Sequence, residues 1–253
     1  MRKLLQSTST VQFLIAGGTG KVGNSIHNYL KPYYNCYILM KQSCGIIYKV
    51  PNIDKNIKTV VLYCSSLTPH NSSFLAKERA YSRLRISSLL KEICFSIKDL
   101  EIIYFSSISV YDISDPVISL SSSYNLTNSY GLYKLEIEVL CQRLCNELSL
   151  KLTIIRLPAV LTKSSNNSLV KSLSLLASNR RLSAYNLSRF YNACISIPNL
   201  ISCIQAIVKK DWRFGCFNLC STSSMKFRDI LFYSSRLLRA PRKIDAALDR
   251  GSV

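Results

Sequence analysis

The sequence has few of the residues that bind transition metals. Only two histidines occur, His27 and His70, and the ten cysteines stand singly without a Cys-x-x-Cys pair. Cys141 and Cys145 are four residues apart on an expected helix, where two small core side chains explain them better than half of a zinc site. We therefore expect no metal centre, and the scattered thiols point to reduced cysteines in a cytoplasmic protein.

Long apolar runs are missing as well. A membrane-spanning helix needs roughly 18 or more consecutive apolar residues, and the chain has no such run, so we expect no membrane span. The opening residues 1–5, which include Arg2 and Lys3, stand too close to the first expected strand, near Gln12, for us to expect a secretory signal. The 253 residues suit one large α/β domain, or such a domain with a small appendage.

Acidic residues are scarce and unevenly placed. The chain has 14 of them against 33 basic residues, a net charge of +19, with none before Asp54 and none between Glu147 and Asp211. Such a charge favours anionic ligands. No recognised nucleic-acid module is present, so we expect no nucleic-acid partner. A bound dinucleotide, a nucleotide-diphosphate substrate and a solvated basic face all stay open as explanations.

Glycine is also rare, yet four of the 8 glycines fall in one segment, at Gly17, Gly18, Gly20 and Gly23. The segment follows the apolar run 13–16 and precedes an expected helix. In dinucleotide-binding folds, glycines of such a loop allow the turn, the approach of a pyrophosphate and close packing of helix on strand. A plain loop between a core strand and a helix would give the same pattern, so other residues must support the assignment.

Short apolar runs alternate with helical periods along the chain. The expected strands cover residues 13–16, 36–40, 59–63, 100–105, 152–156, 193–197 and 216–219, and expected helices cover 75–97, 129–148, 198–210 and 227–238, with one amphipathic helix within 164–188. On the helix 75–97 we expect a core face formed by Leu84, Leu89, Leu90 and Ile93. This alternation predicts an α/β fold with a Rossmann-like doubly wound parallel sheet.

The predicted domain organisation is uneven. Residues 1–162 are expected to form the dinucleotide-binding domain and residues 163–253 a small C-terminal substrate-binding lobe. Segments near 193–220 are expected to return to the sheet of the first domain.

Candidate catalytic residues follow the expected strand 100–105. Ser107 stands at its carboxyl end, and Tyr130 and Lys134 are four residues apart on the helix 129–148, so they share a face. A nearby ammonium stabilises a phenolate and lowers the pKa of a tyrosine, which makes it a usable acid or base for a hydroxyl group. The spacing alone is weak evidence, because Tyr37 and Lys41 repeat it on an expected strand.

In combination, these motifs resemble the extended short-chain dehydrogenase/reductases, the NAD-dependent epimerase/dehydratase family, over nearly the whole chain. The matching segments are Gly17-x-x-Gly20-x-x-Gly23, Tyr63-Cys64-Ser65-Ser66, residues 106–111, Tyr130-Gly131-Leu132-Tyr133-Lys134 followed by Glu136, and Ile155-Arg156-Leu157-Pro158. The resemblance implies that Ser107, Tyr130 and Lys134 form a catalytic triad. It also implies that NAD or NADP is bound by Gly17, Gly18, Thr19, Gly20, Lys21, Val22, Gly23, Lys41, Ser65, Tyr130 and Lys134.

The end of the second strand bears on the choice of cofactor. An acidic residue there would bind the ribose 2′-hydroxyl of NAD, whereas a cation tolerates the 2′-phosphate of NADP. Here Lys41 and Gln42 follow the strand. We therefore expect a slight preference for NADP, with Lys41 reading the 2′-phosphate.

The departures from the family pattern concern the substrate more than the cofactor. Residues 192–200 lack three acidic positions that the family usually has, Ala159 replaces a common asparagine, and Thr162 and Lys163 replace a glycine and a proline. The resemblance implies an NAD(P)-dependent epimerase or 4-ketoreductase acting on a nucleotide-diphosphate sugar or a similar small anionic substrate. The alternative is a non-catalytic dinucleotide-binding subunit of a larger assembly. A homodimer also stays open.

Overall fold

The computed structural model describes residues 10–42, 47–65, 75–112, 117–161, 190–191, 194–209, 214–220 and 225–237. Its contacts divide the chain into two compact units, Met1–Leu157 with Pro198–Leu219, and Pro158–Ile197 with Cys220–Val253. The first break thus falls after Leu157, a few residues before the predicted one. The role of the second unit in substrate binding stays a prediction. Within the described ranges, no helix combines the length and apolar character that crossing a bilayer requires.

A seven-stranded sheet forms the centre of the first unit, in the order β10-β6-β5-β4-β1-β2-β3. Its strands are β1 (Val11–Ala16), β2 (Asn35–Lys41), β3 (Tyr48–Lys49), β4 (Lys58–Tyr63), β5 (Leu100–Ser107), β6 (Lys151–Leu157) and β10 (Gly215–Asn218). All neighbours pair in parallel except β3, which is antiparallel to β2. The predicted α/β class and the parallel sheet are confirmed.

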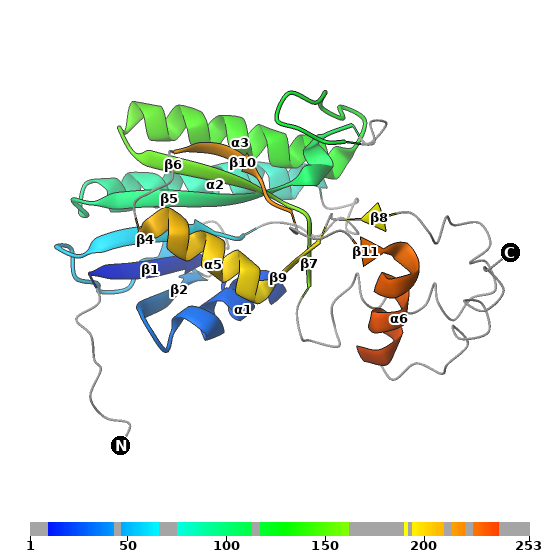
Figure 1. Cartoon of the computed structure of the whole chain (residues 1–253). Coiled ribbons are helices and arrows are strands. Elements are labelled where there is room, and N and C mark those ends of the chain that lie inside the picture. The colour runs from blue at the N-terminus through cyan, green and yellow to red at the C-terminus, as the bar shows by residue number, and fades with distance from the viewer. Residues whose placement is uncertain are drawn as a thin grey trace, which may run out of the picture. The chain divides into compact units, whose positions relative to one another are not determined.

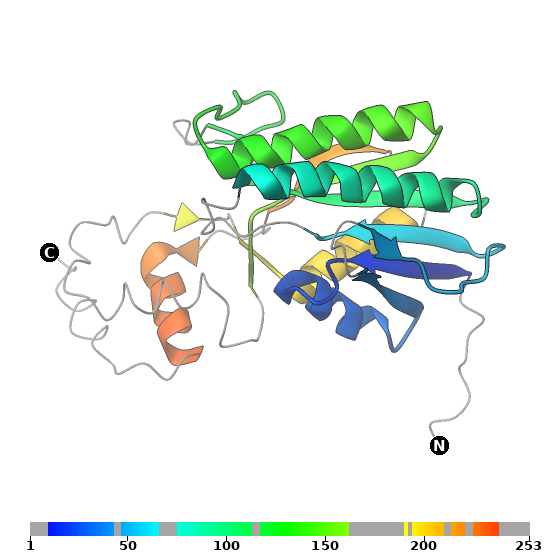
Figure 2. The same cartoon turned by 180° about the vertical axis from the view of Figure 1, so that it is seen from behind.

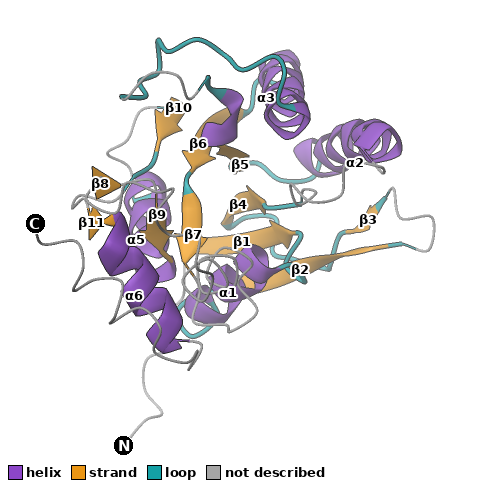
Figure 3. Cartoon of the chain, turned by 90° about the vertical axis from the view of Figure 1, so that its right-hand side faces the viewer, coloured by secondary structure: helices purple, strands orange, loops and turns teal. Residues whose placement is uncertain are grey.

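Helices cover both faces of this sheet (Figures 1 and 2). Figure 3 shows α1 (Lys21–Leu30) and α5 (Ile197–Val208) on one face, and α2 (Leu75–Cys94) and α3 (Ser129–Glu147) on the other. The Ser82 and Tyr133 hydroxyls, 2.8 Å apart, join α2 to α3. The chain runs from β1 to β2 on one side and then returns to β4 on the other, so the order reverses beside β1. In such sheets ligands bind outside the carboxyl ends of the strands at this reversal.

The core consists of apolar strands sandwiched between these helices. In β1, the four residues from Phe13 to Ala16 have no exposed surface, as expected of a parallel strand buried on both faces. On α2, Leu89, Leu90 and Ile93 are buried as predicted, but Leu84 is 52% exposed, so that assignment was wrong. At 3.6 residues per turn the buried face of α2 continues instead through Ile86 and Ser82, and Leu84 points outward.

The second unit contains short elements. Strand β7 (Ala159–Leu161) pairs in parallel with β9 (Cys194–Ser196), and β8 (Phe190–Tyr191) pairs with β11 (Met225–Lys226), which leads into α6 (Phe227–Leu237). Strand β9 and helix α6 match predicted elements. Strands β7, β8 and β11 were not predicted, because strands of only two or three residues are too short to show a hydrophobic period. The amphipathic helix expected within 164–188 lies outside the described residues.

Candidate active site

The glycine segment joins β1 directly to α1, as predicted. Gly17 has a φ of +81°, and a Cβ at this position would lie 2.7 Å from the backbone nitrogen of Ser65, after β4. A Cβ at Gly23 would collide with the carbonyl oxygen of Gly17, which accepts a 2.9 Å hydrogen bond from the Gly20 amide. Only glycine therefore allows this turn to pack between β4 and the first turn of α1.

Helix α1 begins in a way that suits a phosphate group. Gly20 is its N-cap residue, no side chain caps the helix, and its first turn contains no acidic residue. Thr19, Gly20 and Lys21 are exposed, and Val22 is partly buried. The amino end of a helix has a partial positive charge, and a cap without a side chain leaves space for a ligand. The residues present therefore fit the pyrophosphate of a dinucleotide.

The remaining predicted cofactor residues follow neighbouring strands. A Cβ at Gly18 would lie 2.7 Å from the Ile38 side chain, so this glycine lets the loop pack against β2. Lys41 is the last residue of β2 and is exposed. Ser65 is buried beside Gly17. The structure thus brings Gly17, Gly18 and Ser65 together and places Lys41 at the carboxyl end of the adjacent strand.

Ser107 ends β5 and caps the 3₁₀ helix η2 (Ile108–Val110). Its hydroxyl accepts a hydrogen bond from the Ser109 amide at 3.2 Å and donates one to the Ser109 hydroxyl at 3.1 Å. A Cβ at Gly131 would collide with the Ser109 carbonyl oxygen. Gly131, which the sequence analysis did not single out, therefore lets α3 start directly against the segment that follows Ser107.

Tyr130 and Lys134 lie in the first two turns of α3. The Asn128 side chain accepts hydrogen bonds from the amides of Tyr130 and Gly131, which fixes the start of the helix. Tyr130 is partly buried, and Lys134 is 3% exposed. The Lys134 Nζ donates a 2.7 Å hydrogen bond to the Phe105 carbonyl oxygen in β5. The three predicted catalytic residues therefore lie around the carboxyl end of one strand.

The environment of Lys134 changes its acidity. Burial lowers the pKa of its ammonium to about 8, partly opposed by Cys64 and Glu138. Burial also raises the pKa of the Cys64 thiol to about 12, although Lys134 acts in the opposite direction. A lysine with a pKa this close to neutral can exchange a proton under ordinary conditions, and such perturbed groups gather at functional sites.

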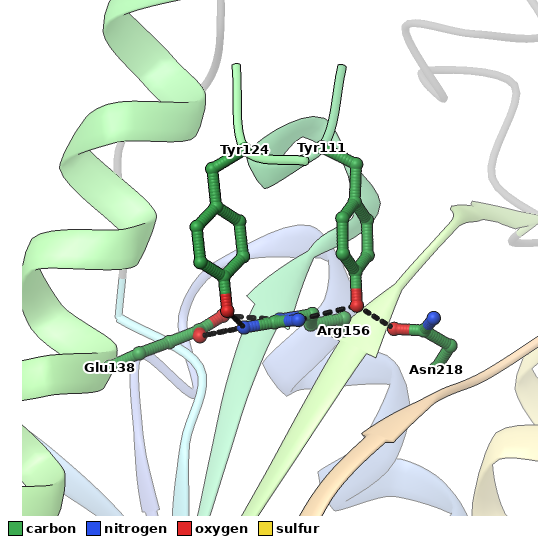
Figure 4. A network of polar contacts seen from close by, with 5 residues as sticks. All are labelled: Tyr111, Tyr124, Glu138, Arg156 and Asn218. Carbon is green, nitrogen blue, oxygen red and sulfur yellow. Dashed lines mark hydrogen bonds and ion pairs between the residues drawn. The ribbon is translucent and has the colours of Figure 1, made fainter. Parts of the chain in front are cut away.

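One buried carboxylate was missed in the sequence analysis. Glu136 lies on the outer side of α3, where its carboxylate is 3.1 Å from Arg83 of α2. The buried acidic residue is Glu138, which pairs with Arg156 of β6 (Figure 4). Tyr130, Lys134 and Glu138 are spaced by four residues each, so helical periodicity from the predicted pair could have identified it.

Several residues in the departures from the family pattern lie beyond the part of the chain that the structure covers: Thr162, Lys163, Asn192 and Ala193. Ala159 opens β7. Among the described side chains, no group of three or more His, Cys, Asp or Glu residues comes together as a metal site.

Comparison with known proteins decides the family. The model of the NAD dependent epimerase/dehydratase family matches residues 13–183. The chain belongs to this family. The family consists of NAD-dependent enzymes of the extended short-chain dehydrogenase type, which confirms the resemblance and the enzyme class. No curated protein sequence matches the chain significantly.

Solved structures share the fold at low sequence identity. UDP-glucose 4-epimerase from Thermotoga maritima, crystallised with UDP-glucose, is 14% identical with a TM-score of 0.66, covering 92% of this chain and 84% of its own. RMD from Pseudomonas aeruginosa, complexed with NADPH, is 14% identical with a TM-score of 0.66, covering 90% and 84%. The enzyme WbmG from Bordetella bronchiseptica, in complex with NAD and UDP, is 13% identical with a TM-score of 0.64, covering 90% and 79%.

Proposed function

We propose that this family member is an NAD(P)-dependent epimerase or 4-ketoreductase for a nucleotide-activated sugar, with Ser107, Tyr130 and Lys134 as its catalytic residues. The observation that supports this best is the position of Lys134. Its ammonium is buried against β5 and lies one turn after Tyr130 on α3. The glycine loop of the same unit meets the same edge of the parallel sheet.

Each of the three residues has a separate task in this proposal. The Tyr130 phenol exchanges a proton with the sugar hydroxyl that becomes a ketone, and Ser107 donates a hydrogen bond to the same oxygen. Lys134 stabilises the phenolate of Tyr130 through its positive charge. The bound dinucleotide supplies the hydride acceptor and donor. An epimerase restores the hydroxyl on the opposite face, whereas a ketoreductase starts from the ketone and releases the alcohol.

The cofactor is proposed to be held by the glycine loop. The Gly17–Gly23 turn and the amino end of α1 face the pyrophosphate, while Lys41 contacts the 2′-phosphate of NADP. The related structures contain both cofactors, NADPH in RMD and NAD in WbmG. The preference for NADP therefore rests on Lys41 and the absence of an acidic residue at the end of β2.

The substrate is proposed to be a nucleotide-diphosphate sugar. Two of the related structures were determined with UDP-glucose or UDP. The net charge of +19 on this chain suits a diphosphate. The second unit is proposed to supply the sugar contacts, and the scattered thiols suggest that the reaction takes place in the cytoplasm.

We also propose that two copies associate through α2 and α3. A groove at these helices combines apolar side chains with charges of both signs. It is lined by Leu132, Leu135, Val139, Leu140, Arg83, Glu136 and Arg143. Val139 is 58% exposed within it. A two-fold axis brings the same surface of two chains together, so opposite charges on this surface can pair between copies.

The test of the enzymatic proposal is direct. The purified chain is incubated with NAD⁺, NADP⁺ or their reduced forms and with UDP-glucose, UDP-N-acetylglucosamine or a UDP-4-keto sugar, and both absorbance at the nicotinamide band and the sugar products are followed. An epimerase interconverts two UDP-sugars without net cofactor change, and a ketoreductase consumes reduced cofactor. A chain that binds a dinucleotide tightly and converts none of these substrates supports the non-catalytic subunit instead.

A further inference from the structure

A buried polar network surrounds the Arg156 guanidinium (Figure 4). Its Nε donates to the Glu138 carboxylate at 3.0 Å and its Nη2 at 2.6 Å, and both side chains are almost completely buried. Nη2 also donates to the Tyr124 hydroxyl at 3.1 Å, and Nη1 donates to the Tyr111 hydroxyl. The Tyr111 hydroxyl in turn donates to the Asn218 side chain at 2.8 Å. All three guanidinium nitrogens therefore have partners.

Stability alone is a poor explanation for such a pair. Desolvation of two charges offsets most of their attraction, so packed apolar residues in the same place are often equally stable. Burial acts to lower the pKa of Arg156, but its hydrogen bonds to Glu138, Tyr124 and Tyr111 outweigh burial and raise it. Arg156 is therefore always charged, and its buried positive charge needs the Glu138 carboxylate to balance it.

The network holds the catalytic segment of α3 at two places. Glu138 lies one turn after Lys134 and ties the helix to β6. The second connection starts at Tyr124, which closes the segment between η2 and α3 through an antiparallel bridge with Tyr111. The Asn125 side chain next to it accepts hydrogen bonds from the Thr127 and Asn128 amides.

This second connection ends at Tyr130 itself. Asn128, held by Asn125, caps the first turn of α3 through the amides of Tyr130 and Gly131. Arg156 thus restrains the amino end of α3 through Tyr124 and its third turn through Glu138. Between these two points lies the Lys134 Nζ on the Phe105 carbonyl oxygen.

We propose that Arg156 and Glu138 are positioning residues for Tyr130 and Lys134, and that the Glu138 carboxylate keeps the buried Lys134 ammonium charged. This inference rests on the proposed function for its catalytic consequence, whereas the contacts it is argued from are made by side chains of the chain itself. Arg156 sets the position of α3 along β5 and β6, and Glu138 supplies the negative charge one turn below Lys134.

The charge balance around Lys134 supports a special role for Glu138. Among the described residues, the titratable groups around this ammonium include Cys64 after β4, Tyr104 of β5, and Tyr130, Glu138 and Cys141 of α3. Burial raises the pKa of both thiols and of the Tyr104 phenol, so these three groups are neutral near pH 7. Glu138 is therefore the carboxylate within this set. Arg156 on β6 lies beyond it, with its own charge compensated by the same carboxylate.

The electrostatic part is tested by titrating Lys134 directly. The ε-carbons of lysine are labelled with ¹³C, the Lys134 signal is assigned by its loss in Lys134→Met, and its pKa is measured by NMR without substrate. Glu138→Gln should lower this pKa by on the order of one unit, because a compensating charge is lost and Arg156 is left unbalanced. Glu136→Gln is the matched control, since it removes the same charge from the outer side of the same helix and should leave the titration unchanged.

The positioning part is tested with Tyr124→Phe, which removes one hydrogen bond from a side chain that is 44% exposed and leaves no buried charge. We expect kcat to fall about tenfold with KM for cofactor and sugar nucleotide unchanged, as is usual when a reacting group is slightly misplaced. Tyr33→Phe, on an exposed turn after α1, is the control. If Glu138→Gln does not fold, the double variant Glu138→Gln with Arg156→Met, which leaves no unpaired charge, is compared with Arg156→Met alone, so that the Glu138 charge is the only difference.

The outcomes separate this inference from the proposed function. A Lys134 pKa that is the same in the parent and in the folded Glu138 variant overturns the electrostatic role. A Tyr124→Phe chain with the kcat of the parent overturns the positioning role. A parent chain without turnover, in which the Lys134 titration nevertheless shifts with Glu138, contradicts only the proposed function.

Discussion

The Nζ of Lys134 donates a 2.7 Å hydrogen bond to the carbonyl oxygen of Phe105, two residues before Ser107 on β5. This contact joins the helix that carries Tyr130 to the strand that carries Ser107. It also explains why Lys134 is buried yet has a polar partner, because a buried ammonium without one would be costly.

Tyr130→Phe should abolish turnover and leave cofactor affinity nearly intact, because only the phenolic hydroxyl group is lost. Ser107→Ala removes one hydrogen bond to the reacting oxygen and should lower kcat on the order of 10²-fold, as for loss of one oxyanion donor. Steady-state rates and cofactor titrations measure both. A Tyr130→Phe chain with the parent rate would favour the non-catalytic subunit.

Lys134→Met should weaken cofactor binding and turnover but stabilise the fold at neutral pH. The folded pKa of about 8 lies below the unfolded value of 10.5, so the unfolded chain binds more protons between these values. The parent therefore gains stability as the pH rises from 8 to 10.5, by up to about 3 kcal/mol, and the variant lacks this gain. Urea unfolding at pH 7 and pH 10 measures the difference, and equal pH dependence in both chains would contradict it.

Lys41→Asp should weaken NADP(H) binding more than NAD(H) binding, since a carboxylate repels the 2′-phosphate and can accept a hydrogen bond from the ribose hydroxyl. The ratio of the two dissociation constants, measured by fluorescence titration, is the test. Lys49→Asp, on the neighbouring exposed strand position of β3, is the control. Equal losses for both cofactors would show that Lys41 does not read the phosphate.

Gly17→Ala should lower the stability of the fold, whereas Gly20→Ala should weaken cofactor binding. At Gly17 the positive φ and the Ser65 backbone exclude a Cβ, so we expect a loss of at least about 1–2 kcal/mol in the free energy of unfolding. At Gly20 a Cβ would meet only the Gly17 carbonyl oxygen, at 3.2 Å, so the fold should persist while the methyl group blocks the pyrophosphate. Thermal unfolding and cofactor titration distinguish these effects, and unchanged cofactor affinity in Gly20→Ala would argue against the loop as the phosphate site.

Val139→Lys should convert a dimer into a monomer, because it places a charge among the apolar lining residues of the α2/α3 groove without disturbing the core. Sedimentation velocity of the two chains at equal concentration measures the change. Val117→Lys, an exposed valine outside the groove, is the control. A parent chain that is monomeric at tens of micromolar concentration contradicts the proposed interface.

The sequence was informative where local pattern determines structure. Strands such as β1 and β4 are continuous apolar runs because helices cover both of their faces, so they were found within one or two residues. Strands β3 and β8 are two residues long and depend on a distant partner strand, which no local period reveals. Leu84 was assigned to the core because the helical face was judged from apolar residues alone, whereas Ser82 and Arg85 occupy the buried side.

The candidate site was predictable to a similar degree. The glycine loop, Tyr130 and Lys134 follow from spacing and from the family resemblance, and their placement at strand ends follows from the fold. The Arg156–Glu138 pair could not be predicted from spacing, because it joins β6 to α3 through side chains 18 residues apart in the sequence. The structural role of Gly131 could not be predicted either. A Cβ there is excluded by the carbonyl oxygen of Ser109, which belongs to another element.

The position of β10 sets an order of events during synthesis. This edge strand pairs with β6, and its Asn218 completes the hydrogen bonds of Tyr111, but it is made only after the whole segment that follows Pro158. At roughly 5–20 residues per second, the other strands of the sheet leave the ribosome several seconds before β10 does. The nascent chain therefore lacks β10, the strand that pairs with this edge of β6, throughout that interval.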